Sequence, residues 1–218
     1  QVVPVFAAAE PPPKWNMLDR YLVSAEGAGL PAVVLITKVD LAVDADGHLD
    51  DELAEVAAEY RRVGYPVLLV SAHRGEGLAE VRQALEGKVS VLLGKSGVGK
   101  TSLLNALQPG LGLRVNAVSQ VTGKGKHTTT TMEMFPLEFG AGGAIVDTPG
   151  VREFGLWLEE DAAVDWLYPE MRPFIGQCRF GLDCEHDHEP GCAVQQAVEA
   201  GQIHPRRWQS YLRLKDEV

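Results

Sequence analysis

One segment of the sequence combines glycine, lysine and threonine at the spacing of a phosphate-binding loop. The residues GKSGVGKT at 94–101 fit the pattern G-x-x-x-x-G-K-[ST]. They follow the apolar run VSVLL and precede a helical pattern, which is the context that this motif requires. In such a loop, glycines let backbone N–H groups surround phosphate oxygens, and the positive end of the next helix faces the same anion. The sequence therefore predicts a nucleotide-phosphate site.

The polar side chains of this loop have separate expected tasks. Lys100 reaches the β- and γ-phosphates and neutralises charge during catalysis, whereas Thr101 gives its hydroxyl to Mg²⁺. A glycine-rich turn capped by Thr101 is the simpler interpretation, but it gives Lys100 no role. The residues expected to surround the phosphates are Gly94, Lys95, Ser96, Gly97, Val98, Gly99, Lys100, Thr101 and Ser102.

A second segment, AIVDTPG at 144–150, supplies a carboxylate for the same metal ion. A strand that ends in Asp147 places this residue at the carboxyl edge of the sheet, where it can hold the water shell of Mg²⁺. Gly150 offers an N–H group that can sense the γ-phosphate. Asp-Thr-Pro-Gly is also an ordinary turn sequence, so its assignment to the magnesium site depends on its position about fifty residues after the phosphate loop.

Two further strand ends are typical of guanine recognition. In TKVD, Thr37 ends an apolar run, the stem of Lys38 would lie along the base, and Asp40 would accept hydrogen bonds from guanine N1 and N2. Adenine offers neither donor in that geometry, and leaving the carboxylate unpaired would be costly, so Asp40 is expected to select GTP over ATP. About thirty residues later, Ser71 and Ala72 end another apolar run and are expected to place a backbone N–H at guanine O6.

These motifs occur in an order that is unusual for a GTPase. The base motif and the Ser-Ala pair precede the phosphate loop, and the Asp-Thr-Pro-Gly segment comes last. In a parallel sheet, all loops at the carboxyl ends of the strands face one crevice, so a site depends on spatial neighbours and not on chain order. A circular permutation would therefore preserve the pocket.

The three cysteines of the chain lie together near its C-terminal end and are interleaved with histidine. An odd, clustered set of thiols beside histidines indicates metal binding more than disulfide pairing. Four ligands of this type close the tetrahedron of a structural zinc site, with His188 as an alternative histidine and reduced free thiols as the alternative state. The predicted ligands are Cys178, Cys184, His186 and Cys192.

The elements around these motifs predict an α/β fold with a largely parallel sheet. The short, continuously apolar runs are typical of strands buried on both faces, and they are QVVPVF, PAVVLIT, YPVLLVSA, KVSVLLG and GGAIVDT. Helical patterns lie in WNMLDRYLVSAEGAG, in HLDDELAEVAAEYRRVGY and from Gly99 to about Leu107. MEMFPLEF is expected at a sheet edge because Pro136 cannot donate to a ladder, and residues 116–127 are expected to form a mobile loop.

Composition narrows the classes of protein. A chain of 218 residues with 45% hydrophobic and 23% charged residues is typical of a folded globular protein. No apolar run is long enough to cross a bilayer, so a cytoplasmic location without membrane contact is expected. The net charge of -10 argues against strong autonomous binding of nucleic acid. Because the sequence begins at Gln1 inside a strand-like run, we expect further sequence upstream.

The permuted motif order resembles that of one family, the small-ribosomal-subunit-dependent GTPases called RsgA or YjeQ in bacteria. Three further segments contribute to this resemblance, which covers nearly the whole chain. They are GKGKHTTTT, DTPGVREFGLW and CRFGLDCEHDHEPGCAVQQAVEAGQIHPRRWQSYLRL. It implies a circularly permuted GTPase domain at 1–157 and a small, mainly helical zinc-binding domain at 158–218, with an N-terminal OB-fold that this chain lacks. It also implies a monomeric cytoplasmic GTPase that binds GTP, GDP and Mg²⁺, acts late in maturation of the small ribosomal subunit and contacts its rRNA.

The resemblance assigns two roles in the loop before the last strand. Thr129, between Thr128 and Thr130, would complete the Mg²⁺ shell when the γ-phosphate is present. The residue after DTPG is Val151 and cannot orient the attacking water, so the resemblance assigns that role to His127. A solvated loop histidine is the alternative. The spacing of five residues between Cys178 and Cys184 is one longer than the family's usual four.

Two other functions fit the same residues. One is a nucleotide-dependent RNA-binding module in which hydrolysis is incidental, and the other is an ATP-using P-loop enzyme. Both remain alternatives to GTP hydrolysis on the sequence alone.

Overall fold

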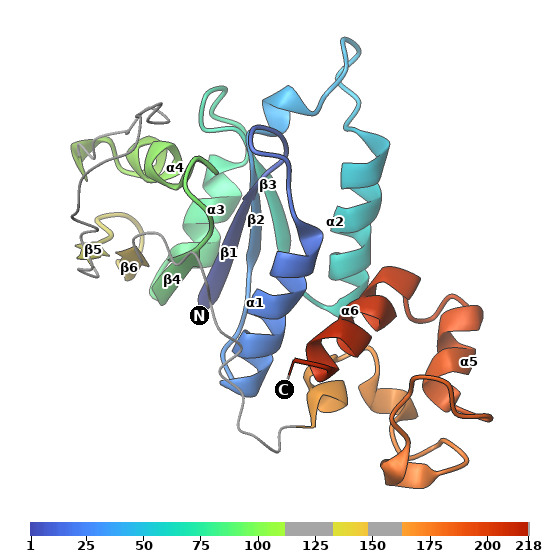
Figure 1. Ribbon diagram of the computed structural model, residues 1–218. Coiled ribbons are helices and arrows are strands. Elements are labelled where there is room, and N and C mark those ends of the chain that lie inside the picture. Colours follow the sequence, from blue (N-terminus) through green and yellow to red (C-terminus); the bar gives the residue numbers. More distant parts are fainter. Residues whose placement is uncertain (112–132, 148–162, 218) are drawn as a thin grey trace, which may run out of the picture. The chain divides into compact units, whose positions relative to one another are not determined.

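The computed structural model describes residues 1–111, 133–147 and 163–217 (Figure 1). These residues form two compact units. Unit 1 comprises Gln1–Pro13, Pro31–Arg61 and the described part of Tyr65–Glu153, and unit 2 comprises Lys14–Leu30, Arg62–Gly64 and residues 163–217. The expected loop at 116–127 and the predicted domain boundary at 157/158 lie outside the described residues, so both stay predictions.

The described part of unit 1 contains a six-stranded sheet in the order β3-β2-β1-β4-β6-β5. All neighbouring strands run parallel except β5 and β6, which are antiparallel. This confirms the predicted parallel sheet and the edge position of the strand that contains Pro136. The strands are β1 (Val2–Ala7), β2 (Val34–Thr37), β3 (Val67–Val70), β4 (Val89–Leu93), β5 (Glu133–Pro136) and β6 (Ala144–Asp147).

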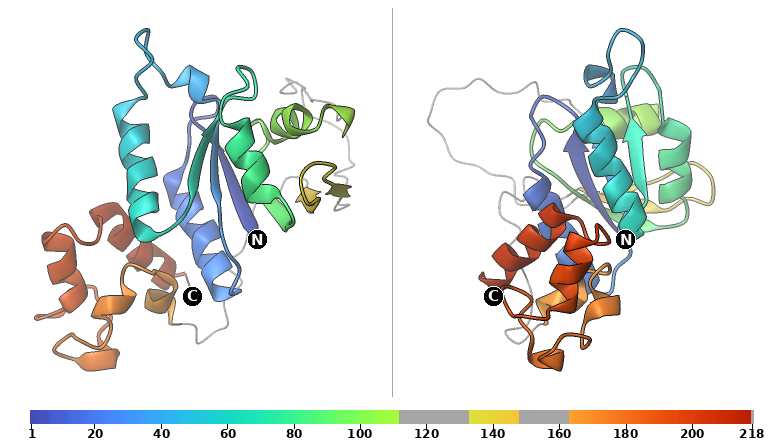
Figure 2. Two further views of the ribbon diagram at one scale, coloured as in Figure 1. Left: turned by 180° about the vertical axis from the view of Figure 1, so that it is seen from behind. Right: turned by 90° about the vertical axis from the view of Figure 1, so that its right-hand side faces the viewer.

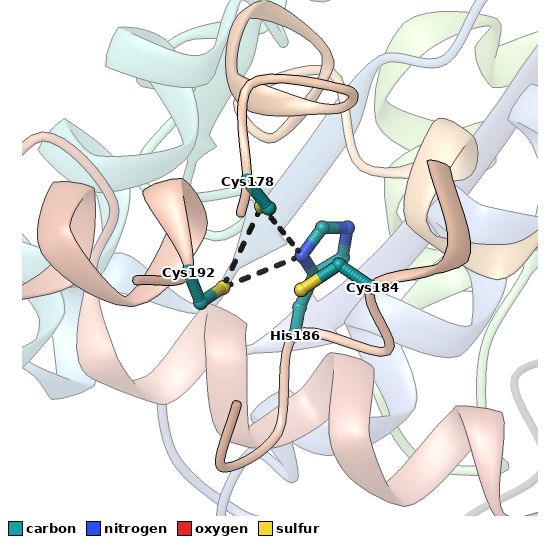
Figure 3. Close-up of side chains that lie close together, drawn as sticks. All are labelled: Cys178, Cys184, His186 and Cys192. Atoms are coloured by element: carbon teal, nitrogen blue, oxygen red, sulfur yellow. Dashed lines mark hydrogen bonds between the residues drawn. The ribbon is translucent and has the colours of Figure 1, made fainter. Parts of the chain in front are cut away.

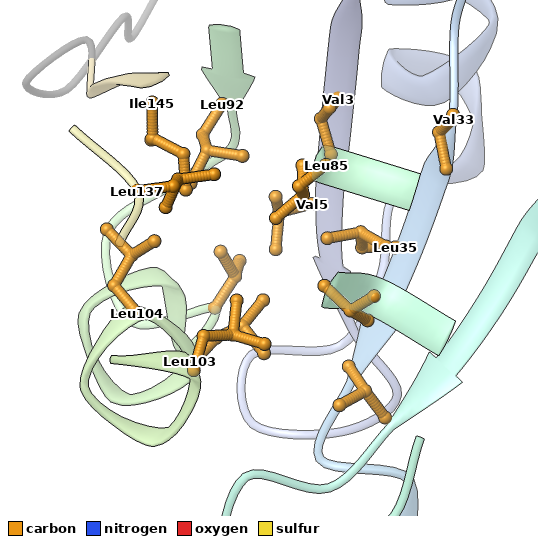
Figure 4. Close-up of a cluster of buried hydrophobic side chains, with 14 of the residues drawn as sticks. Val3, Val5, Val33, Leu35, Leu85, Leu92, Leu103, Leu104, Leu137 and Ile145 are labelled. Atoms are coloured by element: carbon orange, nitrogen blue, oxygen red, sulfur yellow. The ribbon is translucent and has the colours of Figure 1, made fainter. Parts of the chain in front are cut away.

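Helices α3 (Leu78–Leu85) and α4 (Lys100–Leu107) contribute the apolar side chains that cover the strands of unit 1. Figure 2 shows α3, drawn in green, lying along the sheet. In Figure 4, leucines from both helices face valines and leucines from β1, β2 and β4. The buried members of this core are Val3, Val5, Ala7, Val33, Leu35, Val70, Val81, Leu85, Leu92, Val98, Leu103, Leu104, Leu107, Leu137 and Ile145.

Helix α2 (Asp51–Val63) confirms the second predicted helix, and its buried residues include Leu53, Val56, Ala57 and Tyr60. Its end coincides with Gly64, whose φ of 114° is a conformation that glycine adopts readily. Helix α3 was not anticipated. Its eight residues hold only Val81 and Leu85 as fully buried positions, which is too short a stripe to establish a helical period.

Unit 2 contains α1 (Trp15–Gly27), α5 (Ala193–Glu199), α6 (Pro205–Lys215) and short 3₁₀ turns, which include η3 (Val164–Leu167) and η5 (Gly181–Asp183). Helix α1 follows β1 in the chain, yet its contacts place it in this unit. The core of unit 2 combines Val23 of α1 with Val164, Tyr168, Met171, Cys178, Cys184, Cys192, Val194, Ala197, Ile203, Tyr211 and Leu214.

One buried ion-pair network ties α1 to α6 inside unit 2. The guanidinium group of Arg207 donates to Asp19 Oδ1 at 2.5 Å and to Glu170 Oε1 at 2.5 Å, and it lies 4.6 Å from the centre of the Tyr168 ring. The side chains of Arg207 and Asp19 are each 1% exposed. None of the helices among the described residues has both the length and the apolar content that a bilayer crossing requires.

Candidate functional site

The phosphate-binding motif forms the loop between β4 and α4, as the sequence predicts. Gly94 follows the last residue of β4, and a Cβ atom there would collide with the carbonyl oxygen of Val5 in the neighbouring strand. Gly97 and Gly99 have φ angles of 85° and 92°, so the backbone turns in a way that favours glycine at both positions. Gly99 is also the residue before the first turn of α4, whose N-terminal N–H groups face an anion readily.

The Lys100 side chain folds back over this loop. Its Nζ donates to the carbonyl oxygens of Gly94 at 2.6 Å and Lys95 at 3.2 Å. These carbonyls hold the ammonium group at the loop itself, where a phosphate would be the stronger acceptor because it is charged. Thr101 and Ser102 occupy the second and third positions of α4, so both lie in the first turn next to the loop.

The predicted base motif meets the phosphate loop through Thr37. Thr37 is the last residue of β2 and is buried, and its hydroxyl group hydrogen-bonds to the carbonyl oxygens of Phe6, at 3.1 Å, and of Val98. The Cε atom of Lys38 lies 3.8 Å from the point where a Cβ on Gly99 would be. The base motif and the phosphate loop are therefore in direct contact, although about sixty positions separate them in the chain.

Lys38 has a left-handed backbone conformation, with φ of 56°, that ends β2 sharply. Asp40 lies one turn further in the 3₁₀ turn η1 (Val39–Leu41) and is partly exposed. Asp40 therefore lies just beyond the carboxyl end of β2, at the edge of the sheet that also precedes the phosphate loop.

The Ser-Ala pair follows β3 at this edge. Ser71 is buried and exchanges backbone hydrogen bonds with Glu76, which closes a short loop, and its Oγ accepts from the N–H group of Arg74 at 3.1 Å. Ala72 lies in that loop and is partly exposed. Gly77 packs so closely under the loop that a Cβ would collide with the carbonyl oxygen of Leu69.

The residue predicted to supply the magnesium carboxylate follows the same pattern in its backbone position. Asp147 is the last residue of β6, and its backbone pairs with Leu92 of the parallel strand β4, two positions before Gly94. Gly150, His127 and Thr129 lie outside the described residues, as do Thr128, Thr130 and Val151. Their assigned roles remain predictions.

The loop after β1 borders the site, which sequence reasoning missed. The N–H group of Ala8 donates to the carbonyl oxygen of Thr37 at 2.8 Å, and Lys38 Nζ donates to the carbonyl oxygen of Glu10. A Cβ on Gly97 would lie 3.9 Å from Pro11. Main-chain contacts of this kind leave no signature of residue type, so nothing in the segment AAAEPPP pointed to them.

The four predicted zinc ligands converge in unit 2, and Figure 3 shows their three sulfurs around the imidazole. The four potential ligand atoms all lie within 4.8 Å of one another, and all four residues are buried. His186 Nδ1 lies 3.5 Å from Cys178 Sγ and 3.4 Å from Cys192 Sγ. Three thiols and one imidazole nitrogen at these separations fit the donor set and number that a tetrahedral structural zinc ion requires.

Backbone N–H groups support the thiol groups. Cys178 Sγ accepts from Ala193 N at 3.2 Å, and Cys192 Sγ accepts from Gln195 N at 3.5 Å, which also caps α5. The alternative histidine, His188, is exposed and pairs instead with Asp187 at 3.0 Å. The geometry therefore brings His186 and not His188 into the cluster.

The electrostatics of the cluster favour a bound cation. Burial acts to raise the pKa of Cys178, but hydrogen bonds from the N–H groups of Ala193 and Val194 and from the thiols of Cys184 and Cys192 together outweigh it, so its pKa is lowered. Burial, together with the neighbouring thiols, raises the pKa of Cys184 to about 12, and burial also raises the pKa of Cys192. A second and third thiolate are unfavourable here without a positive charge, which a divalent metal ion would supply.

A second group of possible ligands lies on the surface and has a structural explanation. Asp44, Asp46 and His48 are exposed, and Asp44 Oδ1 accepts the N–H groups of Asp46 and His48 at 2.9 and 2.8 Å. This is a turn in which an aspartate side chain caps its own loop.

The similarity to known proteins agrees with this architecture. The RsgA GTPase family model matches residues 1–157. The small ribosomal subunit biogenesis GTPase RsgA of Gemmatimonas aurantiaca is 50% identical over 218 residues, covering 100% of this chain and 68% of that protein. The protein of the same name from Ectopseudomonas mendocina is 48% identical over 216 residues, covering 97% of this chain and 60% of that relative.

Two solved structures share the fold. The crystal structure of YjeQ from Thermotoga maritima has a TM-score of 0.76 at 36% identity, and covers 98% of this chain and 69% of that one. The structure of YloQ, described as a circularly permuted GTPase, has a TM-score of 0.76 at 33% identity and covers 100% of this chain and 67% of that one. A family match over residues 1–157 and a relative 50% identical along the whole chain show that this protein belongs to the RsgA GTPase family, with a circularly permuted GTPase fold.

Proposed function

We propose that this chain hydrolyses GTP and acts in late maturation of the small ribosomal subunit. The observation that carries the proposal is the hydrogen bond between Thr37 and Val98, which joins a guanine-reading motif to a phosphate-binding loop. One nucleotide could contact both motifs at the carboxyl edge of the sheet. Relatives that match 97–100% of this chain are named small ribosomal subunit biogenesis GTPase.

The base would be selected at the ends of β2 and β3. Asp40 would accept the guanine N1 and N2 hydrogens, the stem of Lys38 would lie along the base, and the backbone at Ser71 and Ala72 would donate to O6. Adenine would leave the Asp40 carboxylate facing an acceptor, and an unpaired desolvated carboxylate is costly. GTP is therefore expected to be preferred over ATP.

Charge neutralisation would come from the loop after β4. Lys100 would exchange the carbonyl oxygens of Gly94 and Lys95 for the β- and γ-phosphates, which are charged acceptors and so form stronger hydrogen bonds. The N–H groups from Gly94 to Ser102 would surround the phosphate oxygens. In phosphoryl transfer, positioning and electrostatic stabilisation supply almost all of the catalysis.

The donor groups at this edge also fit a magnesium ion. Thr101 would hold it through its hydroxyl and Asp147 through its water shell, with Thr129 as the residue that completes the shell. When bound, the ion would neutralise charge that develops on the phosphate oxygens. His127 would orient the attacking water as a neutral imidazole that accepts a hydrogen bond. Turnover would be slow in the absence of the small subunit.

The cluster in unit 2 would hold one structural zinc ion through Cys178, Cys184, His186 and Cys192. Four protein ligands leave no open position, so the ion would stabilise the fold of unit 2 and take no part in hydrolysis. The expected partner is the small ribosomal subunit with its rRNA, and the protein is expected to act as a monomer in the cytoplasm, in a domain arrangement of 1–157 and 158–218.

Measurement of GTP turnover by the full chain, with and without purified small ribosomal subunits, tests the proposal. We expect the subunits to raise the rate and His127→Ala to abolish most of that increase. A stimulated rate unchanged by His127→Ala would remove this residue from the mechanism, whereas equal affinities for GTP and ATP would exclude the guanine assignment. Binding to subunits without any stimulation of hydrolysis would favour a nucleotide-dependent RNA-binding module.

A further inference from the structure

We propose that Asp165 positions His186 for metal binding, by accepting the Nε2 proton so that Nδ1 faces the three cysteine sulfurs. The inference rests on the zinc site proposed above and adds a residue to it. Asp165 precedes Cys178 by thirteen positions and is not one of the predicted ligands.

The two nitrogens of the His186 ring face different groups. Nδ1 lies 3.5 Å from Cys178 Sγ and 3.4 Å from Cys192 Sγ, whereas Nε2 lies 3.5 Å from Asp165 Oδ2. A neutral imidazole carries one proton, and a metal ion can bind only the nitrogen that lacks it. A carboxylate at Nε2 favours the tautomer with the proton there, which leaves the lone pair of Nδ1 directed at the sulfurs. Metal-binding histidines in proteins commonly have such an outer carboxylate.

The Asp165 carboxylate is held in place by its own turn. Its Oδ1 accepts from the N–H group of Trp166 at 2.9 Å, which leaves Oδ2 for the imidazole. The backbone carbonyl of Asp165 accepts from Tyr168 N at 3.1 Å, and Val164 and Tyr168, on either side, are buried in the core of unit 2. The Asp165 side chain is 17% exposed, whereas the His186 ring next to it is 1% exposed.

The His186 backbone is fixed from the opposite direction. His186 has a φ of 60°, an uncommon conformation for a residue other than glycine, and Trp208 Nε1 donates to its carbonyl oxygen at 2.8 Å. The neighbouring carbonyl of Glu185 accepts from the Tyr211 hydroxyl at 2.8 Å. Because α6 fixes the main chain of His186, only the rotation of its ring and the choice of tautomer remain open. Asp165 contacts the ring at Nε2, and this contact restricts both.

The other acidic side chains of this loop have different partners. The Asp187 carboxylate pairs with His188 at 3.0 Å, the Glu185 carboxylate with Lys215 at 2.8 Å, and Glu189 accepts backbone N–H groups of its own loop. Among the described acidic residues named here, Asp165 is the one whose carboxylate faces the His186 ring. Asp187 is therefore a matched control, because it is adjacent to the ligand in the chain but points at an exposed histidine.

Zinc affinity of the full chain, measured by competition with a chromogenic chelator, tests the inference. Loss of such an outer partner typically weakens metal binding about 10–100-fold, so we expect that loss for Asp165→Ala. Asp165→Asn should lose less, because its amide oxygen still accepts the Nε2 proton without the negative charge. Asp187→Asn should stay within about twofold of the unchanged protein, since it is exposed and pairs with His188.

The tautomer of His186 gives a second readout, which a purely structural role of Asp165 would not change. Nitrogen NMR of the zinc-loaded chain should show a metal-bound Nδ1 and a protonated Nε2, with an altered Nε2 signal in Asp165→Asn. If Asp165→Ala does not fold, the nearly isosteric Asp165→Asn provides the same test. Zinc bound through Nε2, or Asp165 variants that match the unchanged protein in both readouts, would overturn the inference. An unchanged protein that binds no zinc would instead refute the zinc site itself.

Discussion

The hydroxyl group of Thr37 hydrogen-bonds to the carbonyl oxygen of Val98, a residue 61 positions later in the chain. Thr37 belongs to the predicted guanine-reading motif at the end of β2, and Val98 belongs to the predicted phosphate loop that follows β4. Strand β1 lies between β2 and β4 in the sheet. The same hydroxyl contacts Phe6 of β1 at 3.1 Å. One buried side chain thus connects the segments at the ends of three strands. This contact helps a permuted chain to keep its two predicted recognition motifs next to each other.

Removing the Thr37 hydroxyl should therefore affect both stability and nucleotide binding. Thr37→Val leaves the carbonyl oxygens of Phe6 and Val98 without this donor, and a buried polar group that loses its partner costs about 1–3 kcal/mol. We expect a lower urea midpoint and weaker GTP binding, measured by denaturation and by fluorescent-nucleotide titration. Thr37→Ser, which keeps the hydroxyl, is the control. Equal effects from both substitutions would mean that the methyl group and not the hydroxyl matters.

The choice of base should depend on Asp40. Asp40→Asn replaces an acceptor-only carboxylate by an amide that can donate, so the site should favour xanthine nucleotides and reject guanine. A charged hydrogen bond contributes about 1.5–3 kcal/mol, and we expect GTP affinity to fall by about tenfold to more than a hundredfold. Competition of GTP, XTP and ATP against a labelled nucleotide measures the change. A variant that still prefers GTP over XTP would show that Asp40 does not contact the base.

The charge of Lys100 should be needed for phosphate binding and turnover. Lys100→Ala removes the ammonium group that now lies on the carbonyls of Gly94 and Lys95, and we expect GTP hydrolysis to fall by at least about a hundredfold. Lys95→Ala is a matched control in the same loop, because the Lys95 side chain is exposed and its expected contribution is its backbone. Steady-state phosphate release measures both. Similar losses from the two variants would point to loop disruption and not to the Lys100 charge.

Much of this fold follows from sequence because its strands are buried on both faces and carry continuous apolar runs. The edge position of β5 followed from Pro136 alone, since a missing donor excludes a central strand. Helix α3 was missed because Val81 and Leu85 are too few to show a period, and tertiary packing stabilises it. The assignment of α1 to unit 2 depends on contacts such as Asp19 with Arg207, and partners 188 positions apart leave no local pattern.

In the candidate sites, too, some residues can be predicted from the sequence and others only from the packing. Gly94, Lys100 and the four Cys and His ligands follow from residue type and spacing, because each chemistry restricts the types that can perform it. Glu10 takes part through its backbone carbonyl, which any residue could supply. Asp165 is one carboxylate among many in an acidic chain, and its pairing with His186 depends on how η3 packs.

The buried Arg207 should be essential for the stability of unit 2. Arg207→Ala would leave Asp19 and Glu170 without their cation, and breaking a buried ion pair by removing one partner costs about 3–5 kcal/mol. Arg213→Ala, on the exposed face of the same helix, should change stability by less than about 0.5 kcal/mol. Urea unfolding followed by tryptophan fluorescence compares the two, since Trp166 and Trp208 report on unit 2. A loss for Arg207→Ala no larger than that for Arg213→Ala would show that the network is dispensable.

Metal removal should destabilise unit 2 without removing the nucleotide site. The core of this unit includes Cys178, Cys184 and Cys192, so loss of the ion would leave buried thiols with unfavourable electrostatics at its centre. Elemental analysis should find one zinc per chain, and a strong chelator should lower the thermal midpoint of unit 2 while the chain still binds GTP. Cys192→Ser should reproduce this effect, because it removes a thiol ligand while the serine hydroxyl can still cap α5. Thermal unfolding with and without chelator, alongside GTP titration, measures both units. A chain that contains no zinc and has an unchanged midpoint after chelation would mean that the thiols serve only as core residues.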